Sequence, residues 1–169
     1  MKSKMTKNID NKILLTDTLS IEPDSSSLYP KPFDQIVKGR HRHRVSNVVG
    51  LTKFGVNVDR LESGAFSSAR HWHTKQDEFI YVLAGTLTLV SDEGHTEISE
   101  GTSVGFPAGV SNGHQIANFS KSDAWYIEVG DRPSNEIVTY PDIDMLNTVD
   151  NGKPFFTHKD GRAFSEESN

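Results

Sequence analysis

His71, His73 and Glu78 form a short group of residues that can bind a metal ion. His71 and His73 are separated by one residue, so in a β-strand both side chains point to the same face. Four residues then leave room for a tight turn before Glu78, which opens an apolar run that ends at Gly85. Two imidazoles and a carboxylate on one face make a metal-ligand set.

A second polar run further along the chain supplies another histidine. The segment FPAGVSNGH has the composition of a strand end, a turn and a new strand that starts at His114. Gly101, Pro107 and Gly109 precede His114, and Asn118 follows it.

The two runs together resemble the two sequence motifs of the cupin superfamily. The first motif falls on Gly64, His71, His73, Glu78 and Gly85, and the second on Gly101, Pro107, Gly109, His114 and Asn118. One extra residue before His71 and two before His114 lie in expected turns, where insertions cost little. The resemblance covers about residues 45–130. It implies a double-stranded β-helix, a small jelly-roll barrel, in which His71, His73, Glu78 and His114 hold one divalent metal ion.

Three imidazoles and one carboxylate suit a borderline divalent ion, namely iron, manganese, nickel, cobalt or zinc. Four protein ligands on an octahedral ion leave two positions for water, substrate or dioxygen. No catalytic acid or base can be assigned from the sequence. The side chains expected to line the pocket or to support the ligands are Ser67, Ala69, Ile80, Phe106, Gln115, Asn118 and Trp125. Because side chains alternate between the two faces of a strand, Tyr81 and Tyr126 are expected on the outer face.

The favoured function is a metal-dependent enzyme for a small molecule, either a dioxygenase or an isomerase or lyase that works through an enediolate. The alternative is a non-catalytic cupin that binds or senses a small ligand and uses the metal structurally, and a metal-free structural cupin is a third hypothesis. The whole pattern resembles stand-alone bacterial cupins, a group without an assigned reaction. The resemblance therefore implies fold and metal, and little about the substrate.

The composition agrees with a soluble enzyme-sized domain. The 169 residues are long enough for one domain with a real core, and the formal net charge of -5 argues against a general nucleic-acid binder. The absence of cysteine excludes disulfides and thiolate ligands. The apolar run Ile13 to Leu15 is too short for a signal peptide, and no stretch approaches the ~20 apolar residues of a membrane span. We therefore expect a soluble, cytoplasmic protein.

A second His-x-His pattern, His41 and His43 in the segment GRHRHRVSN, lacks an acidic residue at the right distance. Its arginines alternate with the histidines and occupy the opposite face of the strand. This pattern favours an exposed or ion-paired edge strand. The alternative is a basic strip that binds an anionic substrate.

Short strands recur between turns from residue 54 onward, which predicts an all-β sandwich or barrel. We expect an N-terminal arm over residues 1–44, the barrel over 45–130, and an apolar C-terminal extension over 131–169 that packs back on the barrel. Phe79, Tyr81 and Leu83 face away from the barrel interior and need a cover. A homodimer is expected, and whether the arm is exchanged between subunits is left open.

Overall fold

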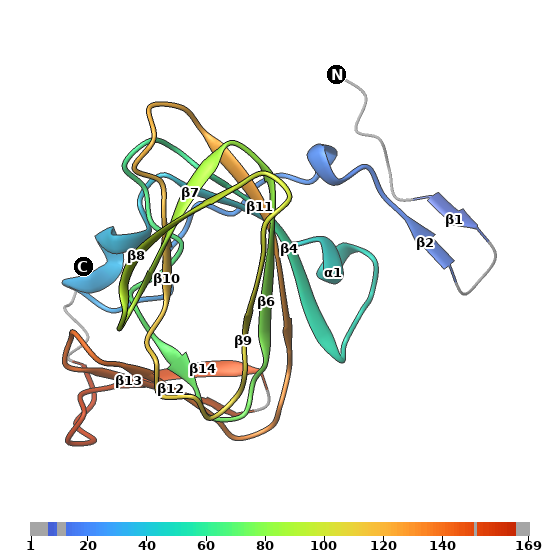
Figure 1. Cartoon of the computed structure of the whole chain (residues 1–169). Coiled ribbons are helices and arrows are strands. Elements are labelled where there is room, and N and C mark those ends of the chain that lie inside the picture. The colour runs from blue at the N-terminus through green and yellow to red at the C-terminus, as the bar shows by residue number, and fades with distance from the viewer. Residues whose placement is uncertain (1–6, 10–12, 151, 165–169) are drawn as a thin grey trace.

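The computed structural model describes residues 7–9, 13–150 and 152–164. Nearly all regular structure in this part of the chain is antiparallel β-strand, and the strands close into a barrel (Figure 1). The all-β jelly-roll fold predicted from the motifs and the turn spacing is confirmed.

One wall of the barrel is a five-stranded sheet. Its order is β3-β4-β11-β6-β9, and all neighbours are antiparallel. The strands are β3 (Arg40–His43), β4 (Phe54–Leu61), β11 (Ala124–Asp131), β6 (Glu78–Ala84) and β9 (Ser103–Phe106). The first of these strands, expected in the arm, therefore lies at the edge of a barrel sheet.

The facing wall is a three-stranded sheet, in the order β10-β7-β8. Its strands are β7 (Thr86–Ser91), β8 (Gly94–Ser99) and β10 (Gln115–Ala117). Gly85 joins β6 to β7 with a φ of 81°, a conformation that glycine adopts without strain. The two walls meet through a buried core whose largest apolar members are Leu61, Ile80, Val82, Leu87, Ile98 and Ile116.

A third sheet ties the C-terminal extension to the first histidine motif. Its order is β14-β13-β12-β5, from β5 (Trp72–His73), β12 (Glu136–Tyr140), β13 (Met145–Asp150) and β14 (Lys153–Thr157). A second buried cluster lies under it, formed by Ala69, Val138, Tyr140 and Met145. The predicted packing of the extension on the barrel is confirmed.

The N-terminal region is partly attached to the barrel. The hairpin of β1 (Lys7–Ile9) and β2 (Ile13–Leu15) stands away from it (Figure 1). Short helices follow at η1 (Thr18–Ser20), η2 (Phe33–Val37) and α1 (Val45–Val48). No helix of the described residues has the length and apolar character needed to cross a lipid bilayer.

The inner face of the five-stranded sheet is polar at one end and apolar at the other. Asp59, Glu78 and Tyr126 point inward, where Arg42 pairs with Asp59, and Leu61 and Val82 on the same face belong to the apolar core. The outer face is also apolar, and Phe79, Tyr81 and Leu83 are 40%, 36% and 36% exposed. Because a barrel interior is normally apolar, the polar end marks a site, and the exposed apolar outer face is an unusual surface.

Candidate metal centre and barrel cavity

The structure brings His71, His73, Glu78 and His114 together around one carboxylate oxygen. Glu78 Oε2 lies 2.9 Å from His114 Nε2, 3.4 Å from His73 Nε2 and 3.7 Å from His71 Nε2. Ligand atoms of His71, His73 and Glu78 lie within 4.8 Å of one another. Three ring nitrogens and one carboxylate oxygen thus converge on a single point.

Main-chain hydrogen bonds explain how residues far apart in sequence meet here. His71 and His114 form an antiparallel bridge, in which each N–H donates to the carbonyl of the other at 3.0 and 2.8 Å. The Gly109 N–H donates to the carbonyl of His73 at 2.8 Å, and Glu78 pairs with Phe106 between β6 and β9. The turn of the second motif is therefore docked directly on the strand of the first.

The ring nitrogens fit a bound cation. The Nδ1–H of His71 donates to the carbonyl of Ala69 at 2.9 Å, which leaves the Nε2 lone pair facing Glu78. Both ring nitrogens of His73 are buried and have no hydrogen-bond partner. Buried nitrogens without partners are costly unless something else satisfies them, and a divalent ion beside Glu78 would satisfy Nε2 of His73.

The ionisation of the group also suits a cation. Burial on its own would raise the pKa of Glu78, but the contact with His114 at 2.9 Å and the nearby rings of His71 and His73 bring it well below the usual value. Burial, the largest cause, lowers the pKa of His114 despite the opposing effect of Glu78. Glu78 is therefore charged and the His114 ring is neutral, as metal ligands must be. Burial, the largest cause, lowers the pKa of His73, but Glu78 and Glu136 raise it overall, so this ring must release a proton when it binds an ion.

A cavity of about 170 Å³ opens beside these four residues. Ser67, Ile80 and Phe106 line it, as expected from the sequence. The ring of Phe106 stacks on His114 with centroids 3.7 Å apart and planes 10° from parallel. Phe106 therefore fixes the orientation of one of the converging rings.

Four other expected pocket residues do not line this cavity. Ala69 packs under the C-terminal sheet, because bends at residues 67–70 interrupt the strand alternation on which its placement was based. Gln115 follows His114 directly and so points to the opposite face, where its Nε2 donates to the carbonyl of Ser68. Asn118 is buried at a corner, and its side-chain amide donates to the carbonyls of Leu61 and Ser122.

Trp125 and Tyr126 occupy the reverse of their expected sides. Trp125 stacks against His43 on the outer face, with ring centroids 5.9 Å apart. Tyr126 is fully buried, and its hydroxyl donates to Asp59 Oδ2 at 2.9 Å. The error arose because the more apolar face of β11 was assigned to the interior, whereas the polar face lines the cavity.

The cavity also contains polar residues that sequence reasoning did not place there, namely Tyr29, Arg40, Arg42, Glu128, Tyr140 and Asn147. Arg42 Nη2 donates to Asp59 Oδ2 at 2.7 Å and to Glu128 Oε2 at 2.6 Å. Burial, the largest cause, raises the pKa of Glu128, although Arg42 opposes this. The alternating arginines of residues 40–44, which the sequence analysis considered as an anion-binding strip, were the one sequence feature that pointed to these polar cavity residues.

The second His-x-His pattern lies outside the cavity. His41 Nε2 contacts Glu62 Oε1 at 2.7 Å, and the Nδ1–H of His43 donates to the carbonyl of Ile21 at 2.8 Å. Within the described ranges, these two histidines belong to no group able to hold a metal ion. The expectation of an ion-paired edge strand at residues 40–43 is confirmed by the position of β3 and by its salt bridges.

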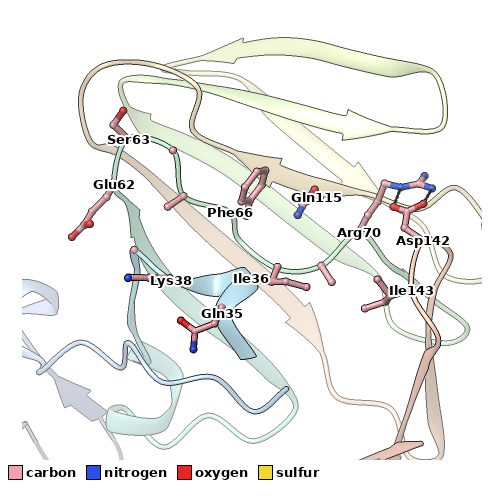
Figure 2. Close-up of a pocket in the computed structure, with 14 residues that line it drawn as sticks. Gln35, Ile36, Lys38, Glu62, Ser63, Phe66, Arg70, Gln115, Asp142 and Ile143 are labelled. Carbon is pink, nitrogen blue, oxygen red and sulfur yellow. Dashed lines mark hydrogen bonds and ion pairs between the residues drawn. The ribbon is translucent and has the colours of Figure 1, made fainter. Parts of the chain in front are cut away.

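A larger groove of about 620 Å³ lies on the outside of the barrel, between η2 and the segment that leads into β5 (Figure 2). Gln115, Lys38 and Phe66 line it, and Arg70 is paired with Asp142 at its edge (Figure 2). It contains none of the converging histidines. The chemistry therefore belongs to the smaller inner cavity.

Comparison with known proteins agrees with the fold and the motifs. Residues 57–130 match the model of the cupin domain family. A crystal structure of a sugar phosphate isomerase of the cupin superfamily from Silicibacter pomeroyi is 41% identical, with a TM-score of 0.84, over 89% of this chain and 96% of that one.

Two further solved structures are more distant. A protein from Acidithiobacillus ferrooxidans, proposed to be a sugar phosphate isomerase, is 26% identical with a TM-score of 0.67 over 76% of this chain and 81% of its own. A polyketide cyclase from Streptomyces resistomycificus shares the fold at 18% identity, with a TM-score of 0.60 over 76% of this chain and 85% of its own. No curated protein matches the chain. The motifs, the barrel and the 41% identical relative together establish that this chain belongs to the cupin superfamily.

Proposed function

We propose that this cupin is a metal-dependent isomerase that acts on a small hydroxy-carbonyl compound of the sugar type. The observation that carries the proposal is the convergence of three imidazoles on one carboxylate beside a polar cavity. The 41% identical relative, a sugar phosphate isomerase, supports isomerisation over the other cupin reactions considered.

In this proposal His71, His73, Glu78 and His114 hold one divalent ion. When bound, such an ion supplies a Lewis acid that polarises a substrate carbonyl. Glu136 acts on His73 through its charge, since its Oε1 lies 3.7 Å from His73 Nδ1 without forming a hydrogen bond.

An isomerisation of a hydroxy-carbonyl compound moves a proton between adjacent carbon atoms, so it needs a group that accepts and returns this proton. We assign that role to Glu128, which lines the same cavity and whose pKa is raised by burial. Tyr140 also lines the cavity, and burial, the largest cause, raises its pKa well above the usual value. Its hydroxyl therefore stays protonated and can donate a hydrogen bond to substrate oxygen.

The test is metal analysis of the purified protein followed by isomerase and dioxygen-uptake screens. The variant His114→Ala is expected to lose stoichiometric metal and activity, because one imidazole ligand is removed. The variant His95→Ala removes an exposed histidine of β8 and should keep both. Full activity of His114→Ala would refute the proposed site. Metal without any turnover would favour the ligand-binding alternative, and dioxygen uptake would favour a dioxygenase.

We also propose that two copies of the chain associate through the outer face of the five-stranded sheet. Phe79, Tyr81 and Leu83 are exposed there, and the hairpin strand β2 exposes Ile13 and Leu15 at 60% and 55%. A two-fold symmetric dimer would cover these apolar surfaces of both copies at once.

A further inference from the structure

Arg40 is a buried cation of the cavity whose hydrogen-bonding capacity is only partly used. The residue is 9% exposed. Its Nη1 donates to the carbonyl of Ser67 at 2.7 Å, and its Nη2 donates weakly to the carbonyl of Ser26 at 3.3 Å. Its Nε–H is buried without any partner. A buried donor of a charged group left without an acceptor is costly, so an acceptor is expected here.

Arg40 also lacks a direct ion pair. Its neighbour Arg42 contacts both Asp59 and Glu128. Among the residues that the structure describes, no carboxylate forms an ion pair with Arg40. The two arginines balance these two carboxylates, so a divalent ion held by Glu78 would give the cavity a net positive charge. Buried charges are normally paired, so this cavity is suited to an anionic ligand.

We infer that Arg40 binds an oxyanionic group, a phosphate or a carboxylate, of a ligand that extends through the same cavity to the converging histidines. Ser67 and Ser68 line the cavity beside Arg40 and offer hydroxyl donors to the same group. The inference rests on the proposed function only for the part of the ligand that reaches the metal ion. It assigns the substrate to the anionic hydroxy-carbonyl compounds.

The experiment is isothermal titration calorimetry with inorganic phosphate and with acetate, on protein freed of metal by chelation and on metal-loaded protein. The wild type is expected to bind an oxyanion in both forms, because Arg40 does not need the metal. The variant Arg40→Met should weaken binding roughly tenfold or more in both forms, since a charge-assisted hydrogen bond is lost. Preference for phosphate would indicate a phosphate ester as substrate, and preference for acetate a carboxylate.

Arg60→Met is the matched control, because Arg60 lies on the adjacent strand β4, is paired with Asp123 and does not line the cavity. It should bind oxyanions as the wild type does. Arg40→Lys keeps the charge without the planar fork, so it should bind with intermediate affinity even where Arg40→Met does not fold.

Two results would overturn the inference. Wild-type affinity in Arg40→Met would show that Arg40 only fastens Ser26 and Ser67 to the barrel, and wild-type affinity in Arg40→Lys would show that the planar fork of Arg40 does not bind the anion. Oxyanion binding that disappears on chelation would place the anion on the metal ion instead. Both results test only the role of Arg40. The proposed isomerase function is tested by a different experiment, which measures the metal content and turnover of His114→Ala.

Discussion

Glu128 is held in the barrel interior by Arg42, at 2.6 Å from Oε2, and by Asn57, whose Nδ2 donates to Oε1 at 3.1 Å. Replacing it with glutamine keeps the shape and removes the basic oxygen. We expect Glu128→Gln to lower kcat by about 100-fold or more, the usual contribution of a general base, with metal content unchanged. Turnover and metal analysis of the same preparation measure both quantities.

The control is Glu97→Gln, because Glu97 is exposed on β8 and lies outside the cavity. It should leave kcat unchanged. A Glu128→Gln enzyme with wild-type turnover would remove Glu128 from the proton transfer and leave the metal site unaffected.

At the residue scale, the sequence predicted the histidine group because its signal is local. The spacing of His71 and His73 needs only strand alternation, and the turn before His114 follows from Pro107 and Gly109. The side chains of β11 could not be oriented in this way. Its apolar residues face outward, and a rule that puts the apolar face inside assigns Trp125 and Tyr126 to the wrong sides.

The C-terminal sheet holds the strand of His73 in place. Glu136, which is 2% exposed, accepts hydrogen bonds from the N–H groups of Thr74 and Lys75 at 2.8 and 2.9 Å. Glu136→Gln loses one of these acceptors, so we expect a loss of about 1–3 kcal/mol in the free energy of unfolding. Metal affinity should fall by up to about 10-fold, because Glu136 fixes the main chain next to His73 and its charge lies 3.7 Å from His73 Nδ1.

Urea denaturation and competition with a chromophoric chelator measure these two effects. Glu97→Gln is again the control and should change neither. If Glu136→Gln loses stability but keeps wild-type metal affinity, Glu136 fastens β5 to β12 without positioning the histidine ring.

The arm is attached to the barrel at a carboxylate whose contribution depends on pH. Asp24 accepts hydrogen bonds from the N–H and hydroxyl of Ser26 at 2.9 and 2.5 Å and pairs with Arg44 at 2.8 Å. The hydrogen bond from the Ser26 hydroxyl is the largest cause that holds its pKa below the ordinary 3.8, and burial opposes it. A carboxyl with a lowered pKa stabilises the fold above its unfolded value, and this contribution disappears as the pH falls through the folded value.

We therefore expect Asp24→Asn to lower Tm by about 2–4 °C at neutral pH, a small effect because the carboxylate is partly exposed. The difference from the wild type should shrink as the pH falls below 3.8. Thermal unfolding followed by circular dichroism at several pH values measures this. A difference that stays constant across the pH range would mean that the charge of Asp24 is not involved.

At the scale of elements, the alternation of apolar and polar residues and the positions of the glycines predicted the short strands and the packed C-terminal extension. The sequence could not show that β12 pairs with β5, because these two strands lie about 65 residues apart along the chain. It also could not show that β13 and β14 extend the same sheet beyond β12. The sequence analysis also placed Arg40–His43 in the arm. This stretch is polar and basic, so its composition gave no indication that β3 pairs with β4 in the barrel sheet.

At the scale of the whole molecule, the five-stranded sheet has two unusual features. One end of its inner face is polar, because it contains the candidate site. The outer face is apolar over β4, β11 and β6, and a monomer would leave Phe79, Tyr81 and Leu83 partly exposed to water. In the proposed dimer, a second copy of the chain would cover this face.

We expect the wild type to sediment as a dimer, with twice the 18.8 kDa of the chain. Tyr81→Glu places a charge at the centre of the apolar face, and burying it in the interface would require desolvation, so this variant should be monomeric at micromolar concentration. Ile137→Glu is the matched control, since Ile137 is 41% exposed on β12 and lies outside this face. Analytical ultracentrifugation distinguishes the two states. An 18.8 kDa wild-type particle, or a Tyr81→Glu variant that remains dimeric, would move the interface elsewhere and leave the apolar face without an explanation.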